Sequence, residues 1–190
     1  MTSTNSFSTT YTPSADGTDG REAHPGRWYA AFTRSNAERT AAAALTRNGF
    51  ETYIPTRVEM RQWSDRRKRV EVLLMPRVVF IRTAPERLPE LVRMSCLTSI
   101  LRSPGQREAA VIPDAEMNRF IFLVGNATEG IEVTPPRVVK GEKVVITRGS
   151  LRGLEGMATQ DSEGMSRLTI LIDNLCCASV SVPLIDLSPV

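Results

Sequence analysis

The stretch "VVKGEKVVITRGSLRGLEGMATQ" (residues 138–160) decides how the C-terminal part of this chain folds. Three of its glycines, Gly149, Gly153 and Gly156, follow a β-branched run and first suggest a phosphate-binding loop. A P-loop needs a Lys-Ser/Thr pair opening a helix, and a dinucleotide loop needs G-x-G-x-x-G before a helix. Neither pattern is present, because "MATQ" follows the last glycine without a helical pattern. We therefore predict that the glycines allow positive φ in a turn and close approach between strands.

The rest of the C-terminal region consists of short extended runs separated by turn residues. These runs are "EKVVIT", "LEGMATQ", "SRLTILID", "CASVSV" and "PLIDL". Leu168, Ile170 and Ile172 alternate with other residues, as expected for a strand with one buried face. This pattern predicts a small all-β barrel over residues 138–190.

The region from 27 to 125 mixes strand and helix signals. "RWYAAFT" is a predicted strand, and "SNAERTAAAALTRNGF" a predicted helix that begins with a capping box of Ser35 and Glu38. A second capping box, Thr83 with Glu86, predicts a short helix, and "PDAEMNRFIFLVGN" predicts another. We expect an α/β sandwich here, joined to the barrel by a Gly/Pro-containing linker at 126–137.

Two extended segments, "FETYIPTRVEMRQW" and "VEVLLMPRVVFIRT", flank a basic tip. They predict a hairpin that projects the tip into solvent. Five of the ten residues in "RQWSDRRKRV" are basic, although the net charge of the whole chain is only +3. Basic side chains on such a tip are expected to contact phosphates of DNA or nascent RNA, whereas a solvated charged face is the plainer alternative.

The N-terminal tail and the overall composition limit the possible functions. Residues 1–26 have few aliphatic side chains, so we expect a disordered tail, and this tail holds His24, the only histidine. Three cysteines without CxxC spacing favour a reducing compartment, and no apolar run is long enough for a membrane helix. We expect a cytoplasmic protein with no metal or other cofactor, and without a nucleophile–base pair no enzymatic reaction can be named.

The C-terminal glycine spacing resembles a KOW motif, in which a hydrophobic strand precedes an x-G-x-x-x-G-x-x-G turn. Upstream, "RWYAAFT", "AERTAAAALTRNGFETYIP", the basic hairpin and "LLMPRVVFIRT" follow in the order of a NusG N-terminal domain. The resemblance covers about residues 27–190, and the chain looks like a specialised paralogue similar to the UpxY group, which acts on capsular polysaccharide operons. Housekeeping members usually read F-P-G-Y where this chain has Met75, Pro76, Arg77 and Val78.

The resemblance implies a transcription antitermination factor whose N-terminal domain binds the clamp helices of RNA polymerase and bridges the DNA cleft. By position, the apolar clamp-binding residues are Phe32, Met75, Val78, Phe80 and Leu101. Ordinary core packing is the alternative, and it is strongest for Phe80 and Leu101. The barrel is implied to dock a ribosomal protein or the termination factor Rho.

The basic hairpin supplies the expected nucleic-acid contacts. The candidate residues are Arg61, Trp63, Arg66, Arg67, Lys68 and Arg69. Trp63 is expected to stack on a base or, alternatively, to pack against the hairpin. Two other functions stay open: a housekeeping NusG-type elongation factor, and a ribosome-associated or RNA-binding KOW protein that needs no clamp surface.

Overall fold

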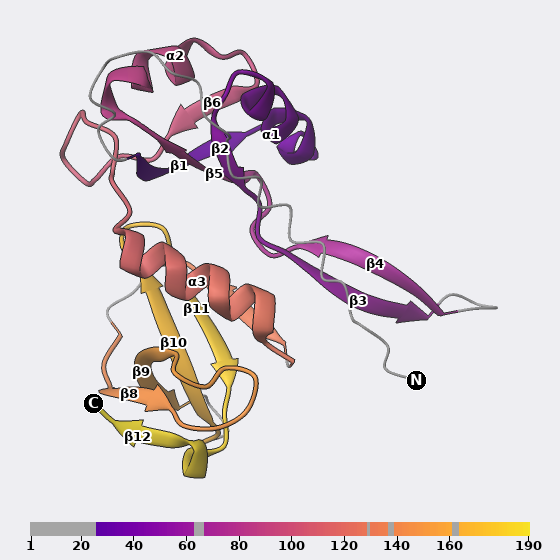
Figure 1. Cartoon of the computed structure of the whole chain (residues 1–190), viewed down its shortest axis with the longest axis vertical. Coiled ribbons are helices and arrows are strands. Elements are labelled where there is room, and N and C mark those ends of the chain that lie inside the picture. Colours follow the sequence, from indigo (N-terminus) through magenta and orange to yellow (C-terminus); the bar gives the residue numbers. More distant parts are fainter. Residues whose placement is uncertain (1–25, 63–66, 129, 137–138, 161–163) are drawn as a thin grey trace.

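The computed structural model describes residues 26–62, 67–128, 130–136, 139–160 and 164–190. The tail predicted at 1–26 lies almost entirely outside these residues, as does the tip of the basic hairpin. Figure 1 shows two antiparallel sheets with a long helix at the C-terminal one, and a two-stranded ribbon that projects away from both. Among the described residues, no helix is long and apolar enough to cross a membrane.

The N-terminal sheet has four antiparallel strands in the order β2-β5-β1-β6. Its strands are β1 (Arg27–Thr33), β2 (Glu51–Tyr53), β5 (Val78–Thr83) and β6 (Leu97–Ile100). Side chains alternate between the two faces of each strand. On β5, Val79 and Ile81 therefore face one way, and Val78 and Phe80 face the other.

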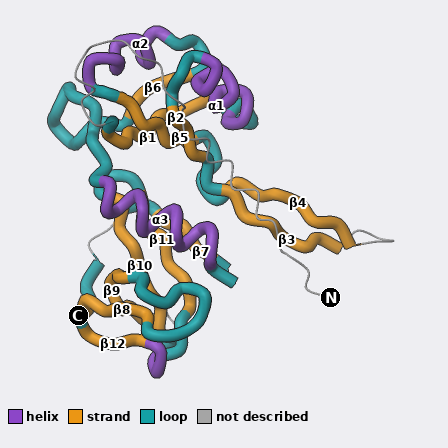
Figure 2. Tube along the Cα trace, viewed as in Figure 1, coloured by secondary structure: helices purple, strands orange, loops and turns teal. Residues whose placement is uncertain are grey.

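Short helices cover the face of the N-terminal sheet that carries Val79 and Ile81 (Figure 2). They are α1 (Glu38–Arg47), the 3-10 turn η1 (Pro85–Arg87) and α2 (Leu88–Arg93). Leu45 of α1 and Leu91 of α2 are fully buried there. Arg87 closes this layer, because its guanidinium lies 4.0 Å from the Phe50 ring centre and donates to the Asn48 carbonyl.

Both predicted capping boxes are wrong. Helix α1 begins at Glu38 after Ala37, and η1 begins after Ala84, and neither has a side-chain cap hydrogen bond. Glu38 is instead 2% exposed and accepts a hydrogen bond from the Arg77 amide. A contact with a residue far along the chain thus replaces the local cap, since a buried carboxylate must be satisfied by whichever donor folding brings to it.

The predicted hairpin is confirmed, and we call it the ribbon: β3 (Thr56–Gln62) paired with β4 (Arg67–Leu73). Both flanking extended segments are interrupted. The first breaks at Pro55, which separates β2 from β3, because proline has no amide hydrogen to give to a ladder. The second breaks at residues 74–77, where the chain turns from β4 into β5.

The C-terminal sheet has six antiparallel strands in the order β12-β8-β9-β10-β11-β7. They are β7 (Ile131–Thr134), β8 (Glu142–Ile146), β9 (Glu155–Gln160), β10 (Ser166–Ile172), β11 (Cys176–Ser181) and β12 (Leu187–Pro189). A 3-10 turn, η2 (Leu184–Asp186), precedes β12. Strand β7 lies inside the segment expected to be a linker. This segment forms a strand because it pairs with β11, where Ile131 is buried opposite Val180.

Helix α3 (Asp114–Asn126) lies between the two sheets. Toward the N-terminal sheet, the Phe120 ring lies 5.7 Å from Phe80 and 6.4 Å from Tyr53. Toward the C-terminal sheet, the Glu116 carboxylate accepts a hydrogen bond from the Asp173 amide at 3.1 Å, and α3 packs along β10. One hydrophobic cluster therefore runs through both sheets and the helix.

Gly149, Gly153 and Gly156 of the opening stretch serve the turn and the close approach that the sequence predicts. Gly149 and Gly153 have φ of 82° and 85°, in the left-handed region that favours glycine. At Gly156 an added Cβ would lie 2.9 Å from the Thr169 carbonyl oxygen and 3.0 Å from the Leu168 side chain. These glycines shape a turn and a tight strand pairing.

Gly156→Ala is expected to lower the free energy of unfolding by about 2 kcal/mol, because the new methyl group overpacks the β9–β10 contact. Chemical denaturation followed by circular dichroism measures the change. Gly125→Ala is the matched control, since an added Cβ on α3 meets nothing within 4 Å. Equal stability of the two variants would contradict the close-approach role.

Candidate functional site

The five residues expected to form an apolar surface lie on one face of the N-terminal sheet, which we call the apolar face. Phe32 of β1 pairs with Val78 of β5, and Ala30 pairs with Phe80, so these side chains point to the same side. The Leu101 amide donates to the Ala30 carbonyl at 2.8 Å, which places Leu101 beside them. All five belong to the same hydrophobic cluster.

The apolar face is covered in this structure. Met75, Val78 and Phe80 are 7%, 5% and 0% exposed, whereas Phe32 and Leu101 are half-buried. The Phe120 ring of α3 covers Phe80, as described above. The cover extends to the C-terminal sheet, because the Cys176 thiol lies 3.9 Å from the Met75 sulfur.

Cys176 acts as a packing residue at this contact. Burial, and to a smaller extent the neighbouring Cys177, raises the pKa of the Cys176 thiol to about 12. The thiol is therefore protonated at neutral pH, and a protonated thiol behaves as a small hydrophobic group with a weak donor. Its contact with Met75 joins residues 101 positions apart in the chain.

A strained turn presents Met75 and Val78. Arg77 has φ of 67°, an uncommon conformation for a residue with a side chain. Its amide donates to the Glu38 carboxylate at 2.6 Å, and its carbonyl accepts from the Thr33 amide at 2.9 Å. The start of α1 and the end of β1 thus fix the turn that joins β4 to β5.

Sequence reasoning missed Glu38 and Cys176 as parts of this site. The sequence pattern places Glu38 in a helix cap and gives Cys176 no role at this face. The departure "MPRV" from the usual F-P-G-Y carried a usable signal, because an arginine in place of glycine at a turn requires compensating contacts. The partner residues of such contacts lie too far along the chain to be identified from local patterns.

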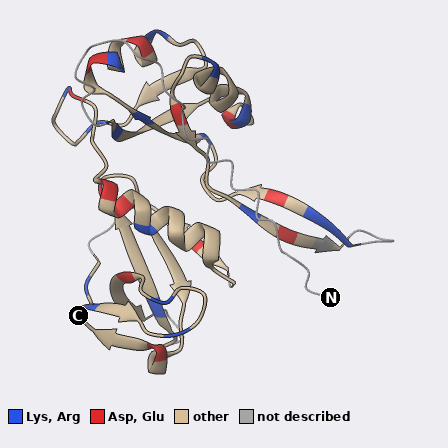
Figure 3. Cartoon of the chain, viewed as in Figure 1, with Lys and Arg blue, Asp and Glu red and all other residues tan. Residues whose placement is uncertain are grey.

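The charges of the ribbon are divided along its length (Figure 3). Near its base, Glu71 pairs with Arg39 at 2.6 Å and accepts from the Thr56 hydroxyl, while Glu59 pairs with Arg57. Farther out, the residues of β4 are all basic and exposed: Arg67, Lys68 and Arg69. The Arg67 side chain donates to Gln62 at 3.1 Å across the ribbon.

The remaining predicted nucleic-acid residues are only partly described. Trp63 and Arg66 lie outside the described residues. The backbone of Arg61 lies in β3 opposite Lys68, and its side chain is not described. The described part of the predicted basic site is therefore the run on β4.

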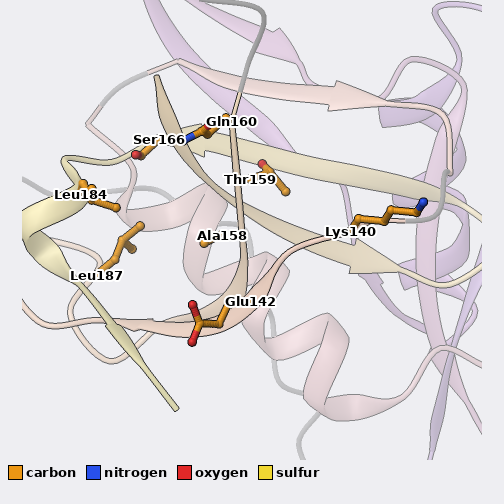
Figure 4. A pocket seen from close by; sticks show the side chains of 8 residues that line it. All are labelled: Lys140, Glu142, Ala158, Thr159, Gln160, Ser166, Leu184 and Leu187. Atoms are coloured by element: carbon orange, nitrogen blue, oxygen red, sulfur yellow. The ribbon is translucent and has the colours of Figure 1, made fainter. Parts of the chain in front are cut away.

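A shallow hollow of about 310 Å³ lies in the C-terminal sheet (Figure 4). Leu184 and Leu187 form one side, and Ala158 and Thr159 of β9 lie between them and Lys140. The neighbouring Ile185 is 79% exposed. None of the hollow's lining residues belongs to the apolar face or to the ribbon.

Several solved structures resemble this chain, including the following two. The NusG of Thermotoga maritima is 18% identical with a TM-score of 0.44, over 87% of this chain and 97% of that one. The MjSpt4:Spt5 complex is 14% identical with a TM-score of 0.28, over 86% of this chain and 96% of that one. No curated protein matches the sequence.

The chain thus combines an α/β domain, which carries an apolar sheet face and a basic ribbon, with a small antiparallel sheet that follows it. The family described as "Transcription termination factor nusG" matches residues 26–121, just over half of the chain. The chain therefore belongs to the NusG family of transcription factors.

Proposed function

We propose that this protein is a transcription elongation and antitermination factor that binds the clamp helices of RNA polymerase through its apolar face. By bridging the DNA cleft, it favours the closed clamp and so suppresses pausing and termination. A bound factor shifts a conformational equilibrium only by its difference in affinity for the two states, and no covalent step is needed. Family membership and the five apolar residues gathered on one sheet face support this proposal.

Polymerase binding requires the apolar face to be uncovered. In this structure α3 and the C-terminal sheet occupy it, so the structure corresponds to a closed state of the proposed factor. The binding-competent state must then be an open one, and the apparent affinity falls in proportion to its population. Opening must break the Cys176–Met75 contact and the packing of Phe120 on Phe80.

Phe32→Ala is expected to weaken binding of the full chain to core RNA polymerase at least tenfold, since the half-buried ring is an aromatic anchor of the proposed interface. Biolayer interferometry with immobilised polymerase measures the change. Val92→Ala, at a residue 68% exposed on α2, is the control and should bind as the parent does. A Val78→Asp variant is less suitable, because its carboxylate would be buried and would disturb folding.

The same experiment tests the competing function. Co-purification of ribosomal subunits in place of polymerase, with no effect of Phe32→Ala, would favour a ribosome-associated KOW protein. Recovery of polymerase that is unchanged by Phe32→Ala would reject the apolar face as the interface.

The protein is further proposed to be a specialised paralogue that acts on surface-polysaccharide operons, as the UpxY-like "MPRV" turn suggests. A housekeeping factor would occupy transcribed genes throughout the genome, whereas a specialised one occupies one or a few operons. Chromatin immunoprecipitation of the tagged protein separates these possibilities.

The C-terminal sheet is proposed to be a KOW-type docking module for a ribosomal protein or Rho, and the ribbon to contact DNA or nascent RNA. The conformations of Gly149, Gly153 and Gly156 support the first assignment. The exposed basic run on β4 supports the second.

A further inference from the structure

The outer half of the ribbon carries positive charge on both of its faces. Residues opposite each other in an antiparallel pair share a face, and successive residues of one strand alternate. Arg67 and Arg69 therefore share the face of Gln62 and Met60, and Lys68 lies on the other face. All three basic residues are exposed.

The acidic residues of the ribbon do not offset this charge. Glu71 is held at the base by Arg39 and Thr56, and Glu59 is engaged by Arg57. The base is thus close to electrically neutral, whereas the described outer part, residues 60–62 and 67–69, contains no acidic residue. A ligand that is attracted by this charge must approach the outer half.

The charge on two opposite faces fits a ligand with phosphates on both sides. A single strand that runs along one face would meet only part of this charge. It would also lack stacking partners on the strands, because β3 and β4 contain no aromatic residue. In a duplex groove, an inserted element lies between two phosphate backbones, so each face can meet one of them.

The width of the ribbon determines which groove of a nucleic-acid duplex it can enter. Two paired strands lie about 4.8 Å apart, and with side chains they suit the major groove of B-form DNA, which is about 12 Å wide and admits a two-stranded ribbon. The minor groove, at about 6 Å, is too narrow. The major groove of A-form RNA is too deep and narrow for side chains to read.

We propose that the ribbon inserts its outer half into the major groove of duplex DNA, with Arg67 and Arg69 facing one backbone and Lys68 the other. This inference rests on the nucleic-acid contact in the proposed function and names its ligand class.

The test measures binding of the full chain by fluorescence anisotropy to four probes of one sequence: duplex DNA, duplex RNA and the two corresponding single strands. Duplex DNA is expected to bind at least tenfold more tightly than the others at about 100 mM salt. The double variant Arg67→Gln/Arg69→Gln and the single variant Lys68→Gln should each weaken duplex binding threefold or more. The slope of log affinity against log salt should fall by about one unit for each lost phosphate contact.

Lys143→Gln is the matched control, because it removes the same charge from an exposed position on β8 and should leave DNA binding unchanged. Tighter binding of either single strand or of duplex RNA would overturn the proposal. The proposal would also be overturned if only one of the two variants, Arg67→Gln/Arg69→Gln or Lys68→Gln, weakened duplex binding. A loss of all binding in Trp63→Ala would overturn it as well, because it would indicate stacking on a single strand.

Failure of this inference is distinguishable from failure of the proposed function. The four-probe measurement contains no polymerase, and Phe32→Ala should leave it unchanged while weakening polymerase binding. Loss of the duplex preference with intact polymerase binding would reject the groove assignment alone. Duplex binding without any affinity for polymerase would reject the proposed function alone.

Discussion

Cys176→Asp is expected to raise the affinity of the full chain for RNA polymerase tenfold or more. Cys176 is 2% exposed and touches Met75 of the apolar face, so a carboxylate there is buried without a partner in the closed state. Such burial costs several kcal/mol, whereas opening returns the charge to water. If the closed state makes up about 99% of the molecules, the largest possible gain is about 100-fold.

Controls separate opening from unfolding. Cys176→Ala removes the sulfur contact without adding charge, and should change the affinity only slightly. Glu116→Ala removes the hydrogen bond donated by the Asp173 amide, which joins α3 to the C-terminal sheet and not to the apolar face, so it should also change the affinity only slightly. Far-UV circular dichroism reports whether the C-terminal sheet is intact, and small-angle scattering reports an increased radius of gyration on opening.

Combining Cys176→Asp with Phe32→Ala should cancel the gain, because both act through the apolar face. A folded Cys176→Asp chain with an increased radius but unchanged polymerase affinity would show that the covered face is not the binding surface.

The elements of this fold were predictable where the signal is local. β1, the ribbon and α3 follow from strand alternation, a basic tip between extended runs, and helix boundary residues. β7 was not predicted, because its four residues gain their order from pairing with β11 rather than from their own pattern. Gly130 and the pair Pro135 and Pro136 lie on either side of β7, so their turn signals mark the ends of the strand and say nothing of the strand itself.

The candidate site was predictable in composition but not in accessibility. Phe32, Met75 and Val78 were expected to be exposed for a partner, yet Met75 and Val78 are buried. The reason is that the chain supplies its own cover, and no local pattern reveals which face of α3 or β11 meets which sheet. Phe80 packs on Phe120, so in this structure it lies in a hydrophobic core, which the sequence offered as the alternative to a binding surface.

Glu38→Ala is expected to lower the free energy of unfolding by about 3 kcal/mol, because it removes the charged acceptor of the Arg77 amide together with a side chain that is only 2% exposed. For a chain of this size the midpoint of thermal unfolding should fall by roughly 6–12 °C. Differential scanning calorimetry measures it. Glu38→Gln, which keeps an acceptor oxygen, should lose clearly less.

The backbone conformation of Arg77 allows a second test of the same turn. Arg77→Gly relieves a left-handed conformation that costs a non-glycine residue roughly 1–2 kcal/mol, so it should recover part of the stability lost in Glu38→Ala. It also removes the guanidinium that donates to the Thr33 carbonyl, which limits the recovery. The double-mutant cycle compares the parent, the two single variants and the double variant. If the changes in unfolding free energy of the two single variants add up to that of the double variant, the carboxylate and the turn act independently, contrary to the geometry. A coupling of 0.5 kcal/mol or more is expected, since residues that share a hydrogen bond couple by about that amount or more.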